Sequence, residues 1–259
     1  MRFIPLFSGS SGNSSLVIAG DVKMLIDAGM AGRAISEALA ELKVRPESLS
    51  AILVTHDHID HTRGVGVMSR KYNIPVYANA GTWRIMEPII KEIPQRNRRV
   101  FSSDQDFYIG NVNIEPFRTP HDAEEAVGFT IVHEGHKLLY MTDIGCLRES
   151  MAEKAVNTDL AFVEANHDIE MLKYGPYPYR LKQRILSEHG HLSNDDCAKL
   201  LIRLYGMGVR TAILAHLSKE NNTPELAYRT VQTALENNGI DDMSVIVARR
   251  DGITGIFDI

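Results

Sequence analysis

Residues 55–61 read Thr-His-Asp-His-Ile-Asp-His, and they follow the apolar run Ala-Ile-Leu-Val at 51–54. Three imidazoles and two carboxylates therefore fall within the six residues 56–61. These groups are the ligands that hold zinc, manganese or iron in proteins. A loop at the end of a buried strand can turn several such side chains towards one point. The alternative is a polar surface loop with histidines clustered by chance, but the density of ligand types favours a metal site.

Outward from this loop, short β-type runs alternate with amphipathic helical patterns. We predict strands at 2–5, 14–18, 22–26, 51–54, 75–78, 107–109, 112–117, 128–133, 137–141, 160–163, 211–214, 244–247 and 255–258. We predict helices near 31–42, 62–72, 82–91, 179–187, 194–205 and 224–237, the fifth capped by Ser193 or Asn194. This order indicates two packed sheets with helices outside, a layered α/β fold.

Composition limits the class of protein. The chain has 259 residues, of which 44% are hydrophobic, enough for a substantial core. Its net charge of −5 excludes a global basic field, so any contact with a polyanion must be a local patch. The two cysteines, Cys146 and Cys197, form no CxxC pair, which argues against a thiolate metal site and fits a reducing compartment. No apolar stretch reaches the roughly 20 residues of a transmembrane helix, so we expect a soluble cytoplasmic protein without a membrane partner.

Three further ligand-type residues follow predicted strands. His121 and His216 come just after β-type runs, and Asp143 ends another. Taken singly, each can equally be a surface residue or a buried one with its hydrogen bonds satisfied. By contrast, His133 and His136 flank a Glu-Gly hairpin turn, and we interpret them as structural.

Taken in order, these residues resemble the signature of the metallo-β-lactamase superfamily. The pattern HxHxDH at 56–61 is followed by His121, Asp143 and His216, and the run Met-Leu-Ile-Asp-Ala-Gly at 24–29 resembles the superfamily's first motif. The resemblance implies a four-layer αββα sandwich, with residues 1–259 forming a single domain. It also implies two divalent metal ions, zinc or manganese, and a hydroxide that bridges them and acts as the nucleophile.

The resemblance assigns the ligands as two sets. His56, His58 and His121 hold one metal, Asp60, His61 and His216 hold the second, and Asp143 bridges both. In this assignment Asp27 steadies the loop by hydrogen bonds. The absence of a cysteine ligand argues against β-lactamase activity.

Three features favour a phosphodiester substrate. Glu164 in FVEANHD and His191 in GHLSND resemble a paired Glu and His of tRNA-3′-processing phosphodiesterases, in which the His protonates the leaving oxygen. His191, Glu164 and Asp60 are therefore the expected catalytic residues. The alternatives are that Glu164 is a surface residue and His191 a helix-entry residue; His167 and His189 are weaker candidates for the acid.

The second and third features are segments that can contact a nucleic acid. Residues 173–184, KYGPYPYRLKQR, hold four basic residues, three tyrosines and no acid. Basic groups neutralise phosphates and tyrosines stack on bases, so Arg180, Lys182 and Arg184 are the predicted substrate-binding residues. The alternative is a loop running into an ordinary helix. The small residues of SGSSGNSS at 8–15 allow close approach to an anion, although a simple turn between strands explains them too.

Together these segments are similar to one branch, the YycJ/WalJ group of small bacterial proteins with this fold. The segments are SGSSGNSS, LIDAG, THDHIDH, TPHD, TDIG, EANHD, YPYRLKQRI, GHLSN and AHLSKENN. The group implies a 5′→3′ exonuclease that acts on DNA and is linked to mismatch repair, with repair proteins as partners. Two alternatives are a small-molecule or cyclic-nucleotide phosphodiesterase of the PhnP-like type, and a non-catalytic regulatory protein, against which the intact ligand set argues.

Overall fold

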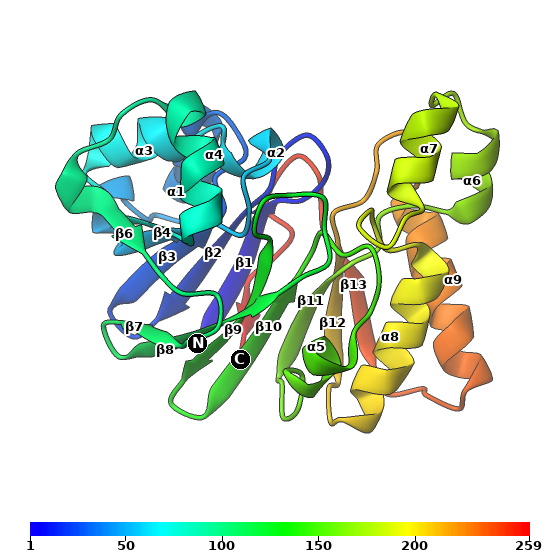
Figure 1. Cartoon of the computed structure of the whole chain (residues 1–259). Helices are drawn as coiled ribbons and strands as arrows, with labels where there is room; N and C mark the ends of the chain where they lie inside the picture. Colours follow the sequence, from blue (N-terminus) through cyan, green and yellow to red (C-terminus); the bar gives the residue numbers. More distant parts are fainter.

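The computed structural model describes all residues 1–259. Two seven-stranded sheets lie face to face, and helices cover the outer face of each sheet (Figure 1). This is the four-layer αββα sandwich, so the predicted fold class is confirmed. No helix is long and apolar enough to cross a membrane.

The first sheet joins both ends of the chain. Its strands, in spatial order, are β14 (Phe257–Asp258), β1 (Arg2–Phe7), β2 (Ser14–Ala19), β3 (Val22–Ile26), β4 (Ala51–Leu53), β5 (Val76–Ala78) and β6 (Arg98–Val100). Neighbours from β14 to β3 are antiparallel, and those from β3 to β6 are parallel. The pairing of β14 with β1 brings the two termini together in Figure 1.

The second sheet is built the same way. Its strands, in spatial order, are β13 (Ser244–Val247), β12 (Thr211–Ala215), β11 (Leu160–Glu164), β10 (His136–Met141), β9 (Val127–His133), β8 (Val112–Arg118) and β7 (Phe107–Ile109). Neighbours from β13 to β10 are parallel, and those from β10 to β7 are antiparallel hairpins. The parallel strands end at one common edge, where loops can carry a site.

Helices cover both sheets. They are α1 (Gly32–Glu41), α2 (Ile59–Thr62), α3 (Val65–Tyr72), α4 (Ala80–Ile90), α5 (Glu149–Glu153), α6 (Ile169–Tyr174), α7 (Tyr179–Ile185), α8 (Asn194–Gly206) and α9 (Pro224–Asn237), with 3-10 turns at Pro46–Ser48 and Gln95–Asn97. In Figure 1, α1, α3 and α4 cover the first sheet, and α5, α8 and α9 cover the second. Helices α6 and α7 stand beyond the upper edge of the second sheet, next to the strand-end loops.

The core has three layers because both faces of each sheet are buried. Met24 packs between the sheets, whereas its neighbour Leu25 packs against the helices of the first layer. Leu138 and Leu139 divide in the same way on the second sheet. This alternation follows from the two-residue period of a strand, and burial on both faces explains why these strands read as continuous apolar runs.

Some elements differ from their predicted form. The predicted helix at 62–72 is two helices, α2 and α3, which meet at Gly64. A β-carbon at Gly64 would clash with the carbonyl oxygen of Met30, so the chain bends where only glycine fits. Strand β6 and helices α5 and α6 were not predicted. Each is short, and β6 exposes two of its three side chains, so it has no hydrophobic period to detect.

Candidate metal centre

Three residues of the centre leave their strands with left-handed backbone angles. Asp27 after β3, Asp143 after β10 and His216 after β12 have φ of 61°, 59° and 56°. For residues other than glycine this conformation costs about 1–3 kcal/mol each and is found where a site needs it. The sharp turns point these side chains over the common edge of the two sheets.

The HxHxDH loop and α2 supply the next group of side chains. His56 and His58 lie in the loop after β4, while Asp60 and His61 lie in α2. One ligand-type atom from each of His56, His58 and His121 falls within 4.8 Å of the others. The same holds for Asp60, His61 and His216. The structure therefore brings together the two sets of three that the sequence analysis assigned to two metals.

Asp143 lies between these two sets. Its Oδ1 is 3.8 Å from His121 Nε2 in one set and 3.5 Å from His216 Nε2 in the other. Its Oδ2 is 3.4 Å from His61 Nε2. A carboxylate in this position can serve two metal ions at once.

The ring nitrogens of these histidines are oriented by buried acceptors. His61 Nδ1 donates to Asp27 Oδ2 at 2.8 Å, His121 Nδ1 donates to the carbonyl of Gly190 at 3.0 Å, and His216 Nδ1 donates to Glu164 Oε1 at 3.1 Å. In each case Nε2 is left as the atom that faces the centre. This is how metal-binding histidines are held in proteins.

The donor set fits divalent metal ions. His56 Nε2 and Asp143 Oδ2 are buried and have no hydrogen-bond partner in the protein. Burial lowers the pKa of His61, but the carboxylates of Asp143, Asp27 and Asp60 outweigh burial and raise this pKa to about 9. Buried charges of this density need a neutralising partner. Nitrogen and oxygen donors without a thiolate suit zinc or manganese.

His191 and Glu164 form a hydrogen-bonded pair at the rim. His191 Nδ1 lies 2.7 Å from Glu164 Oε1, and the His191 side chain is 21% exposed. Glu164 is fully buried and also accepts from the backbone N–H groups of Ile144 and Leu192. It is therefore no surface residue, and the charges and hydrogen bonds of His191 and His216 hold the pKa of Glu164 below its ordinary value despite burial.

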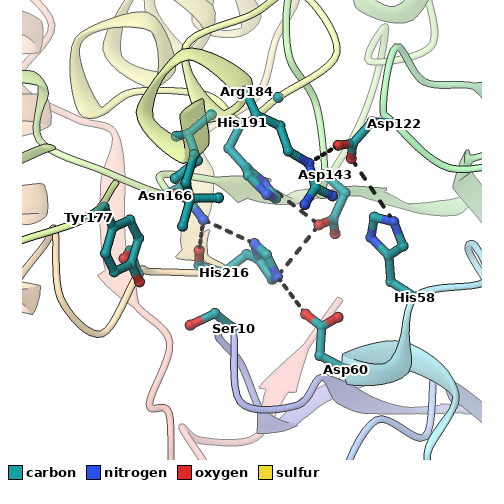
Figure 2. A pocket seen from close by; sticks show the side chains of 14 residues that line it. Ser10, His58, Asp60, Asp122, Asp143, Asn166, Tyr177, Arg184, His191 and His216 are labelled. Carbon is teal, nitrogen blue, oxygen red and sulfur yellow. Dashed lines mark hydrogen bonds and ion pairs between the residues drawn. The ribbon is translucent and has the colours of Figure 1, made fainter. Parts of the chain in front are cut away.

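Some of these side chains line an open pocket of about 240 Å³. In Figure 2, His58, Asp60, Asp143, His191 and His216 face a common hollow. The residues that line the pocket also include the apolar Leu181 and Ile185 and the side chain of Tyr177. One wall therefore carries ligand-type groups and another is suited to a ring or sugar.

The three predicted substrate-binding residues occupy different places. Arg184 lines the pocket and pairs with Asp122, which in turn lies 4.0 Å from His58 Nε2 (Figure 2). Lys182 instead donates to the carbonyls of Lys173 and Gly175, so it closes the loop before α7. Arg180 is exposed and does not line the pocket.

Sequence reasoning missed two asparagines. Asn13 Nδ2 lies 3.0 Å from His61 Nε2 and 3.5 Å from Asp60 Oδ2, and Asn166 Nδ2 donates to the carbonyl of His216 at 2.9 Å. Asn13 belongs to the loop 8–15, so this loop positions ligand-type residues as well as bordering the pocket through Ser10. Of the other histidines, His167 is buried with both ring nitrogens unpartnered, and burial lowers its pKa to about 4, while His189 is exposed.

Asp27 is expected to be a large contributor to stability. It accepts from the Thr55 backbone N–H at 2.8 Å, from Thr55 Oγ1 at 2.9 Å and from His61. Because these donors are buried, Asp27→Ala should lower the free energy of unfolding by about 3–5 kcal/mol. Urea denaturation measures the loss. Asp21→Ala, which removes an exposed acid in the turn between β2 and β3, is the matched control, and equal stability of the two variants would contradict this role.

Comparisons with known proteins agree with this geometry. Residues 23–217 match the family model described as a Beta-lactamase superfamily domain. The chain is 42% identical over 236 residues to exodeoxyribonuclease WalJ of Streptococcus pneumoniae strain D39, covering 90% of this chain and 88% of that protein. It is 38% identical over 239 residues to exodeoxyribonuclease YycJ of Bacillus anthracis, covering 92% and 90%.

A solved structure supports the fold independently. Zn²⁺-bound PqqB from Methylobacterium extorquens has a TM-score of 0.76 to this chain over the full length of both, at 15% identity. At that identity the likeness concerns the fold alone. The matched residues 23–217 include all the ligand-type side chains of the two sets and Asp143. The chain therefore belongs to the metallo-β-lactamase superfamily, in the branch of WalJ and YycJ.

Proposed function

We propose that this protein is a metal-dependent DNA exonuclease that hydrolyses phosphodiester bonds in its open pocket. The observation that carries the proposal is that both sets of ligand-type side chains contribute residues to this pocket, which Asp143 and His191 also line. The two relatives named exodeoxyribonuclease support DNA as the substrate. The PhnP-like alternative has less support, because the diphosphatase of the PhnP family that resembles this chain is 17% identical to it and shows the fold alone.

The proposed ligands are the residues that the sequence analysis assigned. His56, His58 and His121 would hold one divalent metal, Asp60, His61 and His216 the other, with Asp143 shared. Bound at these positions, zinc or manganese would lower the pKa of water and polarise the phosphoryl oxygens. The protein's own task is to aim each Nε2 atom inwards, which the acceptors on Nδ1 of His61, His121 and His216 do.

His191 is the proposed general acid. Cleavage of DNA expels a sugar alkoxide, which is a poor leaving group unless it is protonated as the bond breaks. Glu164 accepts the Nδ1–H of His191, which holds the ring with Nε2 towards the pocket. The remaining proton, on Nε2, is then available to the leaving oxygen at the pocket rim.

The pocket walls suggest how the strand lies. A scissile phosphate would sit over Asp60, Asp143 and His216, while its nucleoside would rest against Tyr177 and Leu181. A pocket of about 240 Å³ suits one terminal nucleotide better than a continuous duplex. The proposed 5′→3′ direction and the repair-protein partners rest on the resemblance to the WalJ and YycJ branch. We also propose that residues 1–259 form one domain, because β14 pairs with β1.

A direct test is a digest of DNA and RNA labelled at either the 5′ or the 3′ end, with added manganese. We expect release of labelled mononucleotides from 5′-labelled DNA at the earliest times and slow loss of label from 3′-labelled DNA. Stepwise loss of the 3′ label first would reverse the polarity. Turnover of cyclic nucleotides or other small diesters with no cleavage of DNA would favour the small-molecule phosphodiesterase.

Arg184 is expected to contribute more to DNA binding than the other basic residues of its segment. Arg184→Ala should weaken DNA binding about tenfold and lower the slope of log K against log salt by about one unit, because one phosphate contact is lost. Binding to a labelled oligonucleotide at several salt concentrations measures both. Arg229→Ala, on the exposed face of α9, is the charge-matched control. If the two variants bind DNA equally well, Arg184 serves only to pair with Asp122.

A further inference from the structure

A second cavity of about 290 Å³ lies beside the proposed active site. Its lining residues include Ser8, Leu217, Arg249 and Arg250. In the sequence, Ser8 and Leu217 are each close to a residue that lines the first pocket. Ser10 and Ser218 line the first pocket. The loop 8–15 and the loop after β12 therefore separate the two hollows and contribute to both.

Arg250 lines this cavity without an ion-pair partner, although Asp251 is also among the lining residues. One guanidinium nitrogen donates to the carbonyl of Ser218 at 3.2 Å. The Nε atom is buried and has no hydrogen-bond partner, and no carboxylate lies within 4.0 Å of the guanidinium. It is the one arginine with a buried, unpartnered side-chain nitrogen. A half-buried cation of this kind is costly unless an anion completes its hydrogen bonds.

The loop 8–15 approaches Arg250 and the carbonyl of Leu217 closely at Gly9. A β-carbon at Gly9 would lie 3.1 Å from the carbonyl oxygen of Leu217 and 3.4 Å from Arg250 Nε, and Gly9 has φ of 152°. Ser8 N–H donates to the carbonyl of Arg249 at 3.1 Å, which ties this loop to the segment after β13. An arginine nitrogen without a partner, beside a loop of small residues, forms a setting that binds anions.

We propose that the Arg250 cavity is a phosphate subsite that binds a second phosphate of the DNA strand, next to the scissile one. The inference rests on the proposed function, because the two cavities share a wall. It assigns the loop 8–15 a role on both sides, with Asn13 facing the metal ligands and Gly9 facing Arg250. The phosphate is either the terminal monoester or an internal diester, and the ends of the oligonucleotide distinguish them.

The test is DNA binding by Arg250→Met, measured with fluorescent oligonucleotides in chelator so that no strand is cut. We expect the dissociation constant to rise about 10- to 100-fold and the salt slope to fall by about one unit. Arg99→Met removes an exposed arginine from β6, at the far edge of the first sheet, and should bind like the wild type. A loss confined to 5′-phosphorylated strands identifies the terminal phosphate, and an equal loss with 5′-hydroxyl strands identifies an internal one.

Two outcomes would overturn the subsite. One is binding by Arg250→Met that equals binding by Arg99→Met. The other is equal loss in Arg250→Met and Arg250→Lys, since Lys keeps the charge and should retain part of the binding. Both outcomes count against the subsite only if the wild-type protein digests DNA. If it digests no DNA, the proposed function itself fails, so the two failures are distinguishable.

Discussion

Asp143→Ala is expected to lose metal from both sets and to abolish hydrolysis. The carboxylate lies within 3.8 Å of nitrogen atoms in both sets, and its removal leaves no group between them. Elemental analysis should fall from two metals per chain towards none, and cleavage of both DNA and bis-p-nitrophenyl phosphate should fall below detection.

His58→Ala is the comparison that separates a shared ligand from a single one. His58 groups only with His56 and His121, so its removal should weaken one metal and leave the other bound. A full load of two metals in the Asp143→Ala protein would contradict the assignment of Asp143 to both sites. A full load in His58→Ala would remove His58 from the ligand set.

His191→Ala should slow DNA hydrolysis by about 10²- to 10⁴-fold, the usual contribution of a positioned general acid, while both metals stay bound. Its Nδ1 is engaged by Glu164, so Nε2 alone faces the pocket. A diester with a p-nitrophenolate leaving group barely needs an acid, so its hydrolysis should fall far less. The ratio of the two rates, with metal content measured on the same samples, is the readout.

The control variant for His191 has to leave the ligands intact. Glu164→Gln is less suitable, because Glu164 also accepts from His216 Nδ1, and its change should disturb metal binding as well. His189→Ala, an exposed neighbour in the same loop, is better matched and should behave like the wild type. If His191→Ala slows both substrates equally or releases a metal, His191 belongs to the metal ligands or the fold.

Much of the centre could be predicted because its residues directly follow strands. His56, Asp143 and His216 each come just after an apolar run, and parallel strands end at the same edge. The positions of these residues in space thus follow from the order of the strands. The predicted pair of Glu164 and His191 lies 27 residues apart and is present in the structure, although the pattern alone left a surface position open for Glu164.

The supporting residues of the centre could not be predicted, because they depend on contacts between distant segments that leave no local sequence pattern. Asn13 reaches Asp60 across 47 residues, and Arg184 reaches Asp122 across 62. Asparagine and aspartate are common in loops, so nothing in these segments distinguishes a supporting residue from a solvated one. The sequence could not separate the roles of the basic residues at 173–184 either. In the structure, the flexible Lys182 folds back onto backbone carbonyls, whereas Arg184 turns to the pocket.

We expect a metal centre in this pocket to hydrolyse DNA from its ends. This expectation is tested most directly by stripping the protein with a chelator, titrating manganese back, and measuring nucleotide release from 5′-labelled DNA together with metal content. The stripped protein should release no nucleotide, and recovery of release should reach its plateau near two equivalents of manganese per chain. Undiminished release from protein without metal, or intact DNA after full reloading, would contradict this expectation.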